Sequence, residues 1–132
     1  MTNLIIRGVH GNMSLVNFLL ILVNTIMLVS GQFLWKTGLQ HNESSFSSLR
    51  AFLQLMVSPY FLGGLFLYGL ATILWLFIIS RVSLSLAYPI QSLAYIMAVF
   101  GAYWVFNEPL SMPKVVGCLL ILAGVVFIGW RG

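Results

Sequence analysis

Uncharged polar residues recur at helical spacing inside otherwise apolar stretches of this chain. Four of them follow the spacing i, i+3, i+4, i+7, which places them on one face of a helix. They are Tyr88, Gln91, Ser92 and Tyr95. An unpaired polar group is costly in hydrocarbon, so such a stripe faces a neighbouring helix or a hydrated path. It is the best candidate for a wall that contacts a polar substrate. For Gln91 and Tyr95, hydrogen bonding that only holds helices together is an equal alternative.

A second polar set lies in the first apolar stretch and ends in a lysine. Asn24 and Gln32 are expected to face the polar stripe across a cavity, although interhelical bonding is the simpler role for Asn17. Lys36 and Arg81, at the edges of apolar stretches, could attract an anionic group such as a phosphate. Snorkelling of each base to lipid headgroups is the alternative.

Acidic residues are absent from the apolar stretches. Both acids, Glu43 and Glu108, fall in the polar segments between them. An exporter that exchanges protons for organic cations needs a carboxylate within the membrane. A cationic substrate would therefore find no counter-ion here.

Enzymatic chemistry is also not indicated. There is no nucleophile–base pair, metal cluster or glycine-rich phosphate loop, and Cys118, His10 and His41 are isolated from one another. We predict no catalytic residue, no metal and no cofactor.

Four apolar stretches must position the polar residues. The chain is 61% hydrophobic and 6% charged, whereas a soluble domain carries roughly 25% charged residues. A stretch of about 20 apolar residues crosses a bilayer. We predict an all-α membrane protein in which residues 1–132 form a single domain with short loops. Its spans are expected at about 15–35, 60–79, 88–106 and 115–130.

A short amphipathic helix is predicted between the first two spans, at about residues 48–57. Leu49, Phe52, Leu53 and Met56 recur at i, i+3, i+4, i+7, which suits a helix lying in the membrane interface. The basic residues are spread singly between apolar runs. Their distribution indicates anchoring at headgroups, and no nucleic-acid partner is predicted.

The flanking charges do not determine an orientation. Arg7, Arg81 and Arg131 fall on one side of the membrane, and Lys36, Arg50 and Lys114 fall on the other. Because the two sides carry equal numbers of basic residues, the positive-inside rule predicts no preferred orientation. This suggests insertion in both directions, as in an antiparallel dimer. The alternatives are that Arg7 is too distant to count or that a partner sets the orientation.

The fourth span carries small residues on one face. Gly117 and Gly124 are seven residues apart, which allows close approach of another helix. Spacing alone does not say whether that contact is internal or lies between two chains.

Several segments resemble small multidrug resistance transporters and, more broadly, the EamA-like group of the drug/metabolite transporter superfamily. Residues 117–125 (GCLLILAGV) look like the fourth helix of these transporters, where the dimer contact forms. Residues 31–36 (GQFLWK) resemble the end of their first helix, and residues 86–92 (LAYPIQS) resemble the entry to their third. The resemblance covers about residues 15–130. The family's first-helix glutamate corresponds to Leu28, so it is missing.

A subset without that acid is a closer match: the paired subunits that flip aminoarabinose-phosphoundecaprenol across the bacterial inner membrane. The shared segments are residues 30–32 (SGQ), 74–76 (LWL), 86–89 (LAYP) and 107–111 (NEPLS), the last with His in place of Asn. By this resemblance Glu108 is a recurrent loop residue. Capping of the fourth helix is its structural alternative.

The resemblance implies a flippase of a polyprenyl-phosphate-linked sugar or similar lipid-linked anion. It would act by alternating access as an antiparallel homodimer or as a heterodimer with a related four-helix subunit. An exporter of small polar or cationic metabolites is one alternative. A non-transporting subunit of a membrane glycosylation complex is another.

Overall fold

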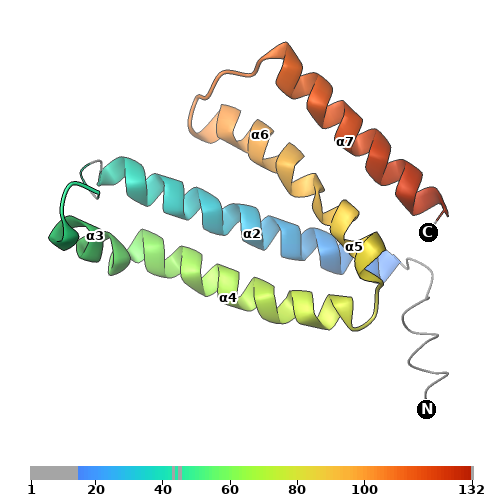
Figure 1. Cartoon of the computed structure of the whole chain (residues 1–132), viewed down its shortest axis with the longest axis horizontal. Helices are drawn as coiled ribbons and strands as arrows, with labels where there is room; N and C mark the ends of the chain where they lie inside the picture. The colour runs from blue at the N-terminus through green and yellow to red at the C-terminus, as the bar shows by residue number, and fades with distance from the viewer. Residues whose placement is uncertain (1–14, 43, 45, 132) are drawn as a thin grey trace.

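The structure is a computed structural model that describes residues 15–42, 44 and 46–131. These residues form helices and connecting turns (Figure 1). The elements are α2 (Leu15–His41), α3 (Leu49–Met56), α4 (Pro59–Ile79), α5 (Leu84–Gln91), α6 (Leu93–Val105) and α7 (Met112–Arg131). Four segments are long and apolar enough to cross a membrane, with α5 and α6 together making the third. The predicted fold class, including a short helix between the first two spans, is confirmed.

The first membrane helix continues past the lysine that was expected to end it. α2 has 27 residues and ends at His41, not at residue 35. At 1.5 Å per residue it is about 40 Å long, which exceeds a hydrocarbon core of about 30 Å. A lysine side chain can reach the headgroup layer from a helix that continues. The last turns of α2 therefore belong in the headgroup layer, with Lys36 near the edge of the hydrocarbon.

Serine side chains cap the N-termini of the next two helices. Ser48 Oγ accepts a hydrogen bond from Ala51 N at 3.1 Å and caps α3. Ser58 Oγ accepts one from Phe61 N at 3.3 Å and caps α4, in which Pro59 is the first residue. A proline is tolerated there because the first N–H groups of a helix have no partner within the helix.

Small residues allow α2 and α4 to pack closely as an antiparallel pair. A methyl group on Gly64 would lie 2.3 Å from Trp35 Nε1 and 2.9 Å from the carbonyl oxygen of Gly31. A methyl group on Gly38 would lie 2.8 Å from Tyr60 Cβ. These glycines make the α2–α4 contact the most extensive one between helices.

The third span begins earlier than predicted and is interrupted. α5 starts at Leu84, not near residue 88, and contains Pro89, which has no N–H to donate. The chain turns at Ser92, whose hydroxyl donates to the carbonyl oxygen of Pro89, and continues as α6. A serine that bonds a backbone carbonyl is a common accompaniment of a break in a membrane helix. Figure 1 shows the change of direction between α5 and α6.

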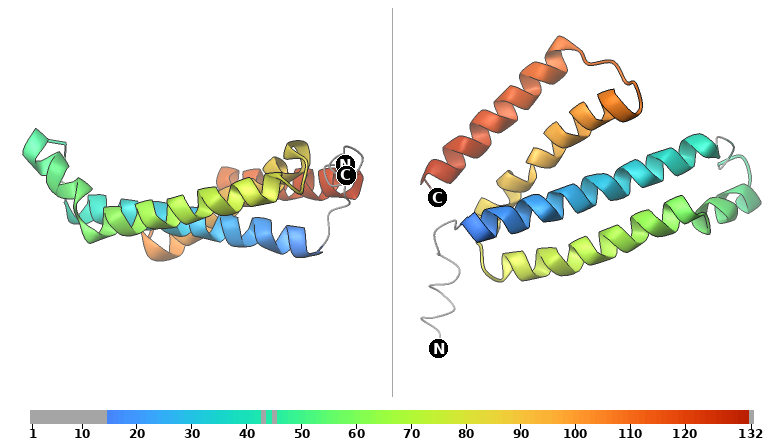
Figure 2. Two further views of the ribbon diagram at one scale, coloured as in Figure 1. Left: turned by 90° about the horizontal axis from the view of Figure 1, so that it is seen from below. Right: turned by 180° about the vertical axis from the view of Figure 1, so that it is seen from behind.

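The helices lie side by side in a flattened array. α4 pairs with α2, the α5–α6 segment packs against α2, and α7 packs against α5 and α6 (Figures 1 and 2). A buried apolar cluster sits where α2, α4 and α5 meet, and includes Ile21, Ile78, Val82 and Ile90. α7 starts at Met112 and is the least buried of the four spans. Much of its surface is consequently left for lipid or another chain.

Candidate functional site

The carboxamide of Asn24 joins three helices at the centre of the array. Asn24 is fully buried, its Nδ2 donates to the carbonyl oxygen of Ala71 at 2.6 Å, and its Oδ1 accepts from Gln91 Nε2 at 2.9 Å. The structure thus brings Asn24 and Gln91 together across α2 and α5. Both groups of the Asn24 side chain are used in these bonds, which suits a role in holding the helices.

A cavity of about 300 Å³ lies beside this bond. All four residues of the polar stripe line it, even though the chain turns at Ser92 between α5 and α6. The lining residues are Leu28, Val29, Gln32, Tyr68, Tyr88, Gln91, Ser92, Ala94, Tyr95 and Ala98. Tyr88 and Tyr95 are 62% and 66% exposed. Their rings are therefore available to a ligand, whereas Gln91 is partly buried.

Tyr68 is a cavity residue that the polar spacing did not reveal. Its hydroxyl accepts a hydrogen bond from Gln32 Nε2 at 2.6 Å. Its ring stacks on Trp35, with centroids 4.6 Å apart and planes at 19°. A tyrosine in the middle of a span, away from the interfacial belt, was the available signal.

A second cavity, of about 320 Å³, carries the charged residues. Gln32, Lys36, Glu108 and Lys114 are among its lining residues. Lys36 Nζ donates to Glu108 Oε1 in an ion pair between α2 and the loop of residues 106–111. Lys114 Nζ donates to the carbonyl oxygen of Pro109 at 2.9 Å.

The carboxylate of Glu108 is stabilised in its charged form. The hydrogen bond from Lys36 is the main cause that lowers its pKa below the ordinary value of 4.5, and the charges of Lys36 and Lys114 add to it. Partial loss of hydration acts in the opposite direction. Glu108 was considered as a cap for the fourth helix, yet the hydrogen bond it accepts is from Lys36.

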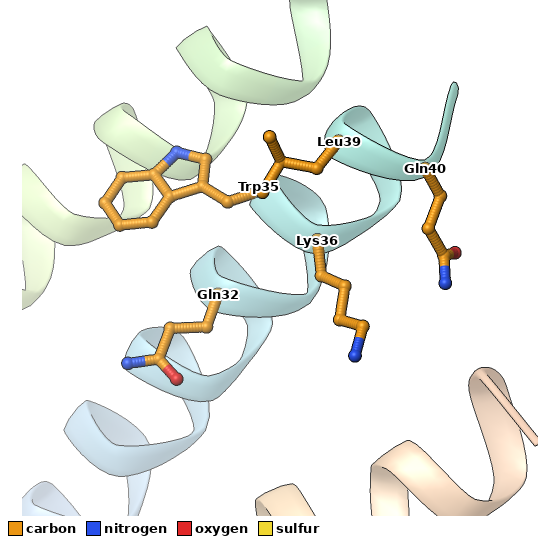
Figure 3. A pocket seen from close by; sticks show the side chains of 5 residues that line it. All are labelled: Gln32, Trp35, Lys36, Leu39 and Gln40. Carbon is orange, nitrogen blue, oxygen red and sulfur yellow. The ribbon is translucent and has the colours of Figure 1, made fainter. Parts of the chain in front are cut away.

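A third hollow, of about 630 Å³, extends past Trp35, Lys36, Leu39 and Gln40 (Figure 3). In Figure 3 Trp35 points toward α4, and Lys36 points toward the second half of the chain. Gln32 lines all three spaces. Leu28, Gln32 and Lys36 are four residues apart and lie on one face of α2. We call the three spaces along this face the α2 groove.

Four of the predicted residues line none of the three spaces. Asn24 is buried next to Gln91 of the central cavity, and Arg81, Gly117 and Gly124 lie away from the α2 groove. Arg81 is in the turn after α4, with its guanidinium 4.7 Å from the ring centre of Phe77. Because α2 and α4 are antiparallel, Arg81 and Lys36 are at opposite ends of the array. Methyl groups added to Gly117 or Gly124 would meet nothing within 4 Å. Neither glycine serves a close contact with the rest of residues 15–42, 44 and 46–131.

The described helices contain no aspartate or glutamate. Leu28, which stands where the small multidrug resistance pattern has glutamate, is part of the central cavity wall. The middle of the α2 groove is consequently lined by amides, hydroxyls and apolar groups, and its charges gather at the Lys36 end.

Four membrane-spanning helices around a polar groove define a multi-pass membrane protein of the transporter kind. The chain belongs to the EamA-like transporter family, which matches residues 4–130. No solved structure is a significant match to the chain.

Curated relatives from several bacteria match most of the chain. One from Shewanella sediminis, "Probable 4-amino-4-deoxy-L-arabinose-phosphoundecaprenol flippase subunit ArnF", is 32% identical over 90% of this chain and 91% of its own length. The corresponding ArnE subunits from Sodalis glossinidius and Erwinia tasmaniensis are 30% and 32% identical, over 85% and 86% of this chain. Each match covers 96% of the relative's own length. The chain is therefore similar to flippase subunits of two names along nearly their whole length.

Proposed function

We propose that this chain is a subunit of a flippase that moves a polyprenyl-phosphate-linked sugar across a bacterial inner membrane. The observation that carries the proposal is the α2 groove, whose middle is uncharged and combines polar with apolar groups and whose one end is basic. The relatives are named as flippase subunits for an aminoarabinose-linked phosphoundecaprenol, and an aminopentose attached to a polyprenyl phosphate is the substrate we propose here.

The groups in the central cavity suit a sugar. Gln32, Gln91 and Ser92 offer amide and hydroxyl groups that can exchange hydrogen bonds with sugar hydroxyls. The exposed rings of Tyr88 and Tyr95 can cover the sugar's apolar face. Lys36 would receive the phosphate, and the polyprenyl tail would remain in the lipid beside the helices. Arg81 lines none of the three spaces, so Lys36 is the base of this pair that we assign to the phosphate.

A pair of chains would complete the transport path. One flattened array does not enclose a substrate, and the open face of α7 with Gly117 and Gly124 offers a surface for a second four-helix subunit. An antiparallel homodimer or a heterodimer could alternate between inward-open and outward-open states around a shared cavity. No catalytic step is required, because translocation leaves the substrate covalently unchanged.

Flipping can be measured directly in liposomes. The full chain, alone or with a candidate partner subunit, would be reconstituted with a fluorescent polyprenyl-phosphate-linked aminopentose. Quenching by a membrane-impermeant reductant reports how much substrate is exposed outside. We expect complete quenching with active protein and quenching of about half the label in empty liposomes, since only the outer leaflet is reachable. Half quenching under every pairing would contradict the proposal.

A non-transporting role in a larger glycosylation complex is favoured by one finding, namely that the relatives are named as subunits. If flipping by a partner is unchanged when this chain is absent, the non-transporting role holds. Transport of small cationic metabolites, with no effect of a lipid-linked sugar on the protein, would instead indicate an exporter.

A further inference from the structure

Three charged side chains converge on one cavity at the basic end of the α2 groove. Lys36, Glu108 and Lys114 all line the space of about 320 Å³. Two ammonium groups face one carboxylate there, so the cavity carries a net positive charge. Lys114 is close enough to help lower the pKa of Glu108. The cavity can therefore accept one further negative charge from a ligand.

The loop of residues 106–111 is shaped to place its carboxylate on Lys36. Asn107 has a φ of 53°, in the left-handed region that asparagine adopts more readily than most residues. The following residue, Glu108, pairs with Lys36 of α2. Lys114 Nζ bonds the carbonyl oxygen of Pro109 and fixes the other side of the loop. The carboxylate is thus held at the cavity by its own loop.

We propose that Lys36 and Lys114 together bind a phosphate group, and that Glu108 occupies this phosphate site while no ligand is bound. Carboxylate and phosphate oxygens are both anionic acceptors for an ammonium group, so each can replace the other on Lys36. The inference rests on the proposed function for the identity of the ligand, a polyprenyl phosphate. It adds Lys114 to the binding residues and makes Glu108 a competitor with the substrate.

The spacing along α2 fits a ligand that reaches both cavities. Gln32 lines the charged cavity and the central one, and it lies one turn, about 6 Å, from Lys36. A phosphate on Lys36 would leave its attached sugar beside Gln32 and Gln91. Displacement of Glu108 would also remove the ion pair between α2 and the loop that joins α6 to α7. Ligand binding would in this way remove one of the contacts that hold the second half of the chain on α2.

Binding of a short polyprenyl phosphate tests this assignment. The full chain in phosphatidylcholine nanodiscs would be titrated with farnesyl phosphate, inorganic phosphate and the uncharged alcohol farnesol, by calorimetry. We expect Lys36→Met and Lys114→Met each to weaken farnesyl phosphate binding about tenfold, and Glu108→Gln to tighten it about tenfold. In the Lys36→Met variant, adding Glu108→Gln should give little of this tighter binding. The substitution acts by releasing the Lys36 ammonium group from its ion pair, and that group is absent from the variant.

Controls separate charge from folding. Arg50→Gln removes an exposed base from α3 at the same end of the array, and should leave the affinity unchanged. Lys36→Arg keeps the charge and should retain binding. Thermal unfolding of each variant verifies that it is folded.

Three results would overturn the assignment: unchanged or weaker binding by Glu108→Gln, wild-type affinity in Lys114→Met, or equal binding of farnesol and farnesyl phosphate. A response to inorganic phosphate without one to farnesyl phosphate would replace the lipid with the free ion. The flipping assay is independent. Flipping together with unchanged affinity in Glu108→Gln overturns the assignment and leaves the proposed function standing. Tighter binding by Glu108→Gln in a chain that flips nothing under any pairing overturns the proposed function and leaves the phosphate site standing.

Discussion

The carboxamide of Asn24 uses both of its polar groups, one on the backbone of α4 and one on Gln91 of α5. The partners of Asn24 are set by the helices that meet around it. Asn24 and Gln91 are 67 residues apart, a separation at which spacing along one helix carries no information. The prediction that they face one another came from the polar character of both spans.

Replacing Asn24 with alanine should reduce stability. Loss of the two hydrogen bonds is expected to lower the free energy of unfolding by about 1 kcal/mol, a typical value for interhelical bonds in membranes. Reversible unfolding in bicelles measures the change. Ser30→Ala, at an exposed position on the same helix, serves as the control. Equal effects of the two substitutions would show that the Asn24 bonds contribute no net stability.

The ion pair of Glu108 predicts a dependence of stability on pH. The pKa of Glu108 is lowered in the folded chain, so its stabilising effect is full above the ordinary value of 4.5. It is lost as the pH falls through the lowered pKa. The difference in Tm between the wild type and Glu108→Gln should be constant from neutral pH to about pH 4.5 and then shrink. A difference that persists in strong acid would contradict this account.

The contact between Lys36 and Glu108 could not be predicted from the sequence. Lys36 and Glu108 were each singled out, yet they are 72 residues apart. Their contact depends on the extension of α2 beyond the hydrocarbon and on the turn at Asn107. Tyr68 was not predicted because its contact with Gln32, 36 residues away on α2, cannot be read from spacing along one helix.

At the scale of elements, hydropathy located the four membrane helices and misplaced their ends. A charged residue ends an apolar run without ending a helix, so α2 continues past Lys36. Pro89 lies within α5 because its neighbours can compensate for the missing N–H, whereas Asn107 and Pro109 do end α6. In these cases local backbone geometry determines where the hydrogen bonds of a helix continue or end. Mean hydropathy carries no information about that geometry.

Close packing of α2 on α4 should be sensitive to a single methyl group. Gly64→Ala would place that group against Trp35 Nε1 and the carbonyl oxygen of Gly31, and the backbone contact cannot be relieved by a side-chain rotation. We expect a loss of about 1–3 kcal/mol in unfolding free energy. Gly69→Ala is the matched control on the same helix, because its methyl group would meet nothing within 4 Å. A smaller loss for Gly64 than for Gly69 would be inconsistent with the packing.

On the scale of the whole molecule, the flattened array could not be derived from periodicity. Helical spacing indicates which residues share a face, but it does not say which helix covers that face. Gly117 and Gly124 illustrate this, since their spacing suits a helix contact that the single chain does not make. The side-by-side order of α4, α2, α5–α6 and α7 is therefore information that the structure adds.

An assembled flippase should depend on the open face of α7. Replacing Gly117 and Gly124 with leucine should leave the Tm of the isolated chain unchanged, because a Cβ atom at either position meets nothing within 4 Å among the described residues. The same change should abolish cross-linking to a second subunit and flipping with it. Cross-linking through single cysteines on α7 measures the first effect. Normal cross-linking of the double variant would place the contact elsewhere.

The close pairing of α2 and α4 also has a consequence for biosynthesis. These helices are consecutive spans, and their glycine contacts lie within residues 31–68. The pair can form as soon as α4 enters the membrane, before the ribosome has completed α5, α6 and α7. The second half of the chain then joins a hairpin that is already folded, and α7 arrives last with one side still uncovered. Of the four spans, the last one made thus carries the surface through which a neighbouring subunit can be recruited.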